Sequence, residues 1–104
     1  MTGAAIFEEV LARGGRVVAG GSTPRLLVPE DLRPSVEAHR LSLRAAVQLW
    51  ALLDTWAGMT EAEWTQEAVD KLHNDIMDIF RDHPAEADGC FRAWRRAHPE
   101  AKLS

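Results

Sequence analysis

Hydrophobic residues recur at every third or fourth position over most of the chain, which is the spacing of an amphipathic helix. In residues 4–13 this spacing places Ile6, Val10 and Leu11 on one face, with two glutamates on the other. Gly14 and a second glycine follow, and glycine accepts the left-handed backbone conformation that often ends a helix. The pattern therefore predicts a first helix that ends at this glycine pair.

Two short apolar segments, Arg16–Ala19 and Arg25–Val28, come next. Valine and leucine between glycine-rich breaks favour strands, and the short connector favours a hairpin that Pro29 ends. Because a two-stranded hairpin alone is marginally stable in water, we expect it to lie on the helices with one face buried. Its edges then stay open to pairing with another strand.

Three further helices are predicted after the hairpin. The first spans residues 34–56, because proline suits the first turn of a helix and the apolar spacing continues to the end of this range. Thr60 and Glu63 form a capping-box pattern that predicts the start of the second helix, and Pro84 ends it. The last helix is short and covers residues 91–97.

The predicted order is helix, strand, strand, helix, helix, helix. We therefore expect an α+β protein in which a small two-stranded antiparallel hairpin packs against about four helices. The length of 104 residues fits a single domain over residues 1–104. Within it, residues 4–53 hold the hairpin part and residues 54–104 form a helical extension.

The formal net charge of -4 is unevenly distributed along the chain. Residues 1–53 hold six arginines and five acidic residues, whereas residues 54–104 hold six basic and eleven acidic residues. An acidic surface argues against broad binding to a phosphate backbone, which needs clustered lysine and arginine. A local basic patch remains compatible with this composition.

Three features indicate a cytoplasmic protein without membrane contact. No run of about 20 apolar residues is present, and the first residues lack the basic and apolar regions of a signal peptide. Cys90 is the only cysteine, so an internal disulfide is impossible, which fits a reducing compartment.

No catalytic, metal or cofactor site is predicted. Asp75, Asp78 and Asp82 share one helix face, and the favoured interpretation is a solvated acidic face, since no HExxH or CxxC motif is present. Cys90 has no obvious base beside it, so we expect a buried or idle thiol.

The first half of the chain follows an ordered pattern of elements. A helix ends in Arg-Gly and is followed by a strand, a turn with glycine, and a second strand that ends near a proline. A further helix carries a histidine and a basic residue ahead of its apolar repeats. The matching positions are Leu11, Arg13, Gly14, Val17, Gly20, Gly21, Leu26, Val28, Pro29, Leu32, His39, Arg40, Leu43 and Val47. Over residues 4–53 the chain thus resembles the TubC-type N-terminal docking domain of nonribosomal peptide synthetases and mixed megasynthases. It departs from the family at Glu30-Asp31, where members usually carry glycine.

The resemblance implies that the second strand and the following helix accept a short C-terminal peptide of a partner subunit as an added strand, with neighbouring charges setting the choice of partner. We add Trp56, because tryptophan is enriched at binding hot spots. The expected partner-binding residues are Arg16, Arg25, Leu26, Leu27, Val28, Arg40 and Trp56. The expected function is a non-catalytic protein–protein docking or adaptor module.

Self-association is a further expectation. Leu41, Leu49 and Leu52 widen the apolar stripe of the helix over residues 34–56 beyond what one small hairpin can cover. We therefore predict a homodimer with at least one of these leucines in its interface.

The alternative function is that of a small phage or mobile-element protein that binds nucleic acid or inhibits a host nucleic-acid-processing complex. The same domain type also occurs in such proteins. Arg92, Arg95 and Arg96 surround Trp94, and basic residues around an aromatic ring can bind a nucleic-acid strand. The competing interpretation, which we favour, places Trp94 in the core and the arginines on the exposed face.

Overall fold

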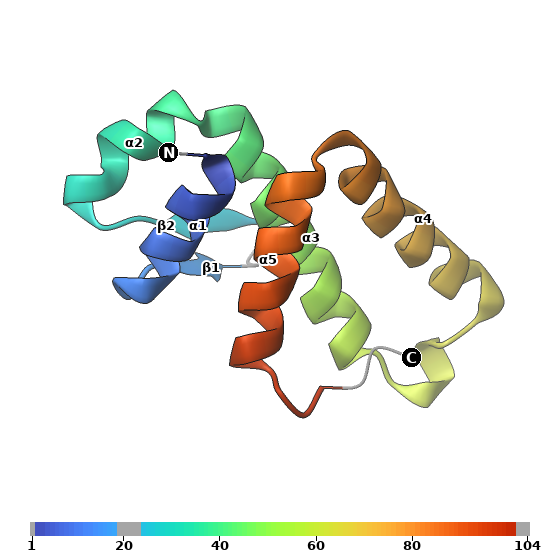
Figure 1. Cartoon of the computed structure of the whole chain (residues 1–104). Coiled ribbons are helices and arrows are strands. Elements are labelled where there is room, and N and C mark those ends of the chain that lie inside the picture. The colour runs from blue at the N-terminus through green and yellow to red at the C-terminus, as the bar shows by residue number, and fades with distance from the viewer. Residues whose placement is uncertain (1, 19–23, 102–104) are drawn as a thin grey trace.

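The computed structural model describes residues 2–18 and 24–101, and shows helices with one small antiparallel hairpin (Figure 1). The predicted α+β class is confirmed. The elements are α1 (Gly3–Ala12), β1 (Arg16–Val18), β2 (Arg25–Leu27), η1 (Glu30–Leu32), α2 (Arg33–Ala38), α3 (Arg40–Gly58), η2 (Glu61–Glu63), α4 (Gln66–Asp82) and α5 (Pro84–Ala97), where η marks a 3-10 turn. The predicted glycine turn at Gly20 and Gly21, and Ala19 at the predicted end of the first strand, lie outside the described residues.

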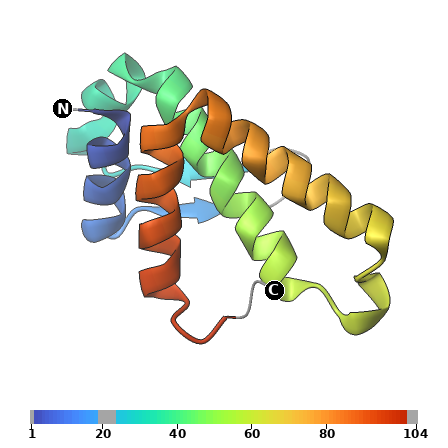
Figure 2. The ribbon, with the colours of Figure 1, turned by 45° about the vertical axis from the view of Figure 1, so that its right-hand side comes forward.

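The core forms where α1, α3 and α5 pack together, with α4 along the other side of α3 (Figures 1 and 2). Apolar side chains at helical spacing on each of these helices face inward. Phe7 of α1 and Trp50 of α3 meet edge to face, with ring centroids 6.0 Å apart. The largest fully buried side chains are Trp94, Phe7, Ile6, Leu49, Leu53, Val10 and Cys90.

The junction between α1 and the hairpin depends on two glycines. Gly14 has a φ of 90°, a left-handed conformation that other residues rarely adopt, and it confirms the predicted end of the first helix. At Gly15 a Cβ atom would lie 2.3 Å from Cγ1 of Val10 and 2.7 Å from the carbonyl oxygen of Leu27. The absence of a side chain here therefore lets the hairpin turn back closely over α1.

The hairpin has one face toward the helices and one toward solvent. β1 and β2 pair with Val17 opposite Leu26, and both of these side chains are partly buried against the core. The flanking pairs, Arg16 with Leu27 and Val18 with Arg25, expose their side chains. The strict alternation of a strand thus separates one apolar face from an outer face that mixes arginine and apolar residues.

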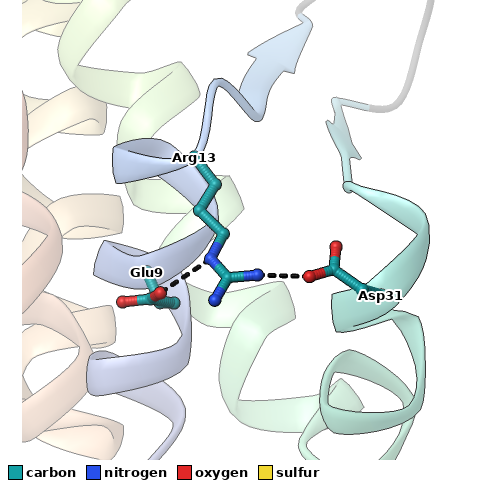
Figure 3. Close-up of polar contacts among 3 residues, drawn as sticks. All are labelled: Glu9, Arg13 and Asp31. Carbon is teal, nitrogen blue, oxygen red and sulfur yellow. Dashed lines mark hydrogen bonds and ion pairs between the residues drawn. The ribbon is translucent and has the colours of Figure 1, made fainter.

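Arg13 joins the end of α1 to the segment after the hairpin (Figure 3). Its Nε lies 2.9 Å from Oε1 of Glu9 on the same helix, and its Nη1 contacts the carboxylate of Asp31 in η1. The ion pair with Asp31 therefore joins the two segments that flank the hairpin.

The helix predicted over residues 34–56 is two helices, because the chain breaks at His39 between α2 and α3. His39 has φ -120° and ψ 32°, outside the helical region, and its backbone N–H bonds to the carbonyl oxygen of Val36. Leu32 and Val36 pack on the same core as α3. The apolar spacing thus continues across the break, which is why it predicted one helix.

The starts of the last two helices also differ from the prediction. The capping box of Thr60 and Glu63 forms, but it begins η2, while α4 starts at Gln66 under a second cap from Thr65. Next to these caps, the indole of Trp64 donates a hydrogen bond to the carbonyl oxygen of Met59, at 3.1 Å. α5 begins at Pro84, well before residue 91, because proline fits the first turn of a helix.

Candidate docking site

A groove of about 300 Å³ lies between β2 and the helices α2 and α3. We call it the β2–α3 groove. Its base is apolar, because the alternation of β2 directs Leu26 inward and the helical spacing of α3 directs Leu43 and Val47 to the same place. The lining residues are Pro24, Leu26, Val36, Arg40, Leu43, Arg44, Val47 and Gln48.

The strand beside this groove has an open edge. In the described part of the chain the sheet has two strands, so β2 pairs with β1 on one side only. Figures 1 and 2 both place β2 between β1 and the α2 segment, which is the side of the groove. An unpaired strand edge is a ready template for another extended chain.

Three arginines with exposed side chains stand at the groove. Arg40 and Arg44 line it and Arg25 begins β2 beside it, and all three are exposed and without an ion-pair partner in residues 2–18 and 24–101. Arg16, Arg33 and Arg95 also have no ion-pair partner among the described residues, whereas Arg13 and Arg81 each contact two carboxylates. Free guanidinium groups beside an apolar groove favour a ligand that carries carboxylates.

The structure brings together some of the residues predicted from sequence. Leu26 and Arg40 line the β2–α3 groove. Arg25 is the first residue of β2 and follows Pro24, which also lines the groove. Leu27 points to the outer face, where it is 46% exposed. Val28 is partly buried against the core.

Arg16 lies apart from the groove. It is on β1 and lines a separate pocket of about 490 Å³ with Leu11 and Trp50. Arg96 and Glu8 stand at the same pocket and pair with each other, at 3.2 Å. Arg16 therefore does not line the β2–α3 groove, although Arg16 and Arg25 are both exposed on the outer face of the hairpin.

Trp56, predicted as an exposed anchor, is partly buried. It packs edge to face on Trp64, with ring centroids 6.3 Å apart, because η2 folds back over the end of α3. It stands sixteen residues after Arg40 on the helix, a distance of roughly 24 Å at 1.5 Å per residue. Trp56 is therefore not part of the groove. Its Nε1 is buried and has no hydrogen-bond partner among the described residues.

Sequence reasoning missed Arg44, Val36 and Gln48. The signal for Arg44 was present, since Arg40 and Arg44 are one helical turn apart and flank the inward-facing Leu43. The contribution of Val36 depends on how α2 folds back toward β2, which the spacing along α3 does not contain.

Cys90 is fully buried, which confirms the predicted buried thiol. Its Sγ donates to the carbonyl oxygen of Ala46, at 3.1 Å. Burial, with a smaller contribution from the charge of Asp54, raises the pKa of the thiol to about 12. The thiolate needed for nucleophilic attack is therefore scarce at neutral pH.

Several acidic residues of the second half and two of the three arginines of α5 form exposed ion pairs. Among the described residues, no group of three or more His, Cys, Asp and Glu is placed to hold a metal ion. Arg92 pairs with Asp88, at 3.2 Å. Trp94 is 0% exposed, which confirms it as a core residue and leaves no ring to stack on a nucleic-acid base.

No protein-family model matches the chain, and no curated protein or solved structure matches it significantly. Within the described ranges, no helix has both the length and the apolar character that crossing a membrane requires.

Proposed function

We propose that this protein is a non-catalytic docking module that captures an extended segment of a partner protein as an added strand beside β2. The observation that carries the proposal is the coincidence of an open strand edge, the apolar β2–α3 groove, and arginines without ion-pair partners in the described part. Strand addition gives affinity through main-chain hydrogen bonds and specificity through pockets for alternate side chains.

The groove defines the chemistry of the partner segment. Because side chains alternate along an added strand, one set faces the groove over Leu26 and Val36 and the other set lies on the outer face near Arg25. The first set should be apolar, with a carboxylate in reach of Arg40 at the rim. The outer set should be acidic. Because β2 is three residues long, the bound segment is short. The charges then contribute more to the choice of partner than to the affinity.

The resemblance of residues 4–53 to TubC-type docking domains supports the same function. The strand and the helix that the resemblance singles out are those that border the β2–α3 groove. The buried, protonated Cys90 is compatible with a protein that has no nucleophilic chemistry.

The experiment uses two synthetic peptides, one alternating leucine with glutamate and one alternating leucine with lysine. Each is titrated into the full chain labelled with ¹⁵N, and the amide signals are followed by NMR. The glutamate peptide should shift the amides of Arg25, Leu26 and Leu27. It should slow hydrogen exchange at those of the three whose N–H groups point to the open edge, because alternate residues of a strand direct their N–H groups to opposite sides. The lysine peptide should leave them unchanged.

Equal binding of the two peptides would show that the arginines do not select the ligand. Shifts confined to α5 or to the pocket at Arg16 would place docking elsewhere. Either result would overturn the proposal.

A further inference from the structure

A second groove runs between α3 and α4. Two adjoining hollows, of about 390 and 320 Å³, share Gln48, Asp78 and Ile79 in their linings. We call the two together the α3–α4 groove, and Leu52 and Asp75 also line it. It exists because α4 buries only Leu72 and Ile76 among its 17 residues. The two helices therefore leave an apolar floor open between them.

Leu41 is the most exposed large apolar side chain of the described residues, at 76%. It stands at the rim of the α3–α4 groove, on the first turn of α3. The exposed leucine and the apolar groove lie on the same surface, so the leucine of one molecule could insert into the groove of another. Of the three leucines predicted for a dimer interface, Leu49 is 0% exposed and does not reach this surface.

The two walls of this groove have opposite charge. Arg44 stands on the α3 wall without an ion-pair partner in the described part, and Asp75 and Asp78 stand on the α4 wall. The aspartates contact Lys71 and Arg81 at 3.2 and 3.3 Å, but these pairs are exposed, so they neutralise the wall only weakly. A surface with one basic wall and one acidic wall is complementary to itself after a twofold rotation.

We propose that a second copy of this chain occupies the α3–α4 groove, across a twofold axis that runs along the groove. Such an axis keeps the two α3 helices parallel and exchanges the walls, so the basic wall of one copy faces the acidic wall of the other. Arg44 and Asp78 line the same hollow, so Arg44 of one copy lies at the level of Asp78 of the second copy. By the same symmetry Leu41 lies over the hollow of the second copy that Ala45 and Ile79 line.

The first test measures the oligomeric state by sedimentation velocity up to high micromolar concentration. The wild type should show a concentration-dependent dimer that weakens as salt screens the paired charges. Leu41→Asp should weaken dimerisation by about tenfold or more, because it places a charge in an apolar pocket. Met77→Asp is the matched control. Met77 is 50% exposed on α4 but lines neither hollow, so this variant should dimerise with the same affinity as the wild type.

The second test exchanges charges between the walls. Arg44→Asp alone and Asp78→Arg alone should each be folded and monomeric, because like charges then face each other in both homodimers. An equimolar mixture should form a one-to-one heterodimer, since the walls of the two variants are complementary. Circular dichroism of each variant separates loss of dimer from loss of fold.

A wild type that stays monomeric at high micromolar concentration would overturn the proposal. Equal behaviour of the Leu41 and Met77 variants would also overturn it, as would a mixture of folded charge variants that does not associate. None of these results bears on peptide capture, because peptide binding to the monomer is measured independently of sedimentation.

Discussion

The indole Nε1 of Trp94 donates a hydrogen bond to Oδ1 of Asp54, at 2.7 Å. The bond joins residues 40 positions apart in the chain and holds the last turn of α5 against α3. His98 stacks on the same indole, with ring centroids 4.3 Å apart and an interplanar angle of 19°. These contacts fix the end of α5 against the end of α3.

Asp54→Ala should destabilise the fold by about 1 to 2 kcal/mol, because it leaves the N–H of a buried indole without an acceptor. Asp54→Asn keeps an oxygen at the same place and should lower the free energy of unfolding by less than half as much. Urea unfolding followed by circular dichroism measures both. Equal losses in the two variants would indicate that the carboxylate charge matters more than the hydrogen bond.

The two indoles at Trp94 and Trp56 allow a matched comparison. Trp94→Phe should cost about 3 kcal/mol, because it opens a cavity at a fully buried site and removes a satisfied hydrogen bond. Trp56→Phe should cost about 1 kcal/mol or less, because its buried Nε1 has no partner to lose within the described structure. Thermal unfolding of both variants checks the order, and a larger loss at Trp56 would contradict it.

The raised pKa of Cys90 predicts a loss of stability in alkaline solution. The ordinary pKa of 9.0 applies to the unfolded chain and about 12 to the folded one, so between these values only the unfolded state releases the proton. The free energy of unfolding should then fall by about 1.4 kcal/mol per pH unit above the lower value. The measurement is urea unfolding against pH. Cys90→Ala is the control and should lack this slope, and since the chain contains no tyrosine the comparison is simple.

Gly15→Ala should displace the hairpin and destabilise the fold by about 2 kcal/mol or more, because the added Cβ meets a backbone carbonyl as well as a side chain. Gly58→Ala is the matched control, since a Cβ there meets nothing within 4 Å. It should be neutral or slightly stabilising. Chemical unfolding of the two variants decides, and similar losses in both would contradict the close approach at Gly15.

The element types could be predicted from sequence because they depend on local spacing. The inward set Ile6 and Val10, the two short strands, and the capping box at Thr60 all form as the pattern indicated. The break at His39 could not be predicted, because the core accepts side chains from both sides of the break and the apolar spacing is unchanged.

The candidate site was predictable only in part. Leu26 and Arg40 follow from the alternation of a strand and the spacing of a helix, and both line the β2–α3 groove. The position of Trp56 depends on how η2 folds back to place Trp64 against it, which is a tertiary contact without a local signal. Arg16 was assigned by its place at a strand start, but pairing in the sheet puts its strand on the side away from the groove.

Arg25→Glu should weaken binding of the leucine–glutamate peptide by about tenfold while the melting temperature stays within error of the wild type. An exposed charge at the start of a strand contributes little to stability, whereas it faces the acidic side chains of an added strand. Calorimetric titration with a melting curve for each protein tests both parts. A variant that binds as well as the wild type would remove Arg25 from the site.

The most direct test of docking on the β2–α3 groove is a calorimetric titration of Arg40→Glu and Arg16→Glu with both peptides. The two substitutions change the net charge equally, but only Arg40 lines the groove. We predict that Arg40→Glu no longer binds the glutamate peptide and binds the lysine peptide instead. Arg16→Glu should bind both peptides as the wild type does. An equal loss in both variants, or no reversal of preference at Arg40, would contradict the assignment of the groove as the docking site.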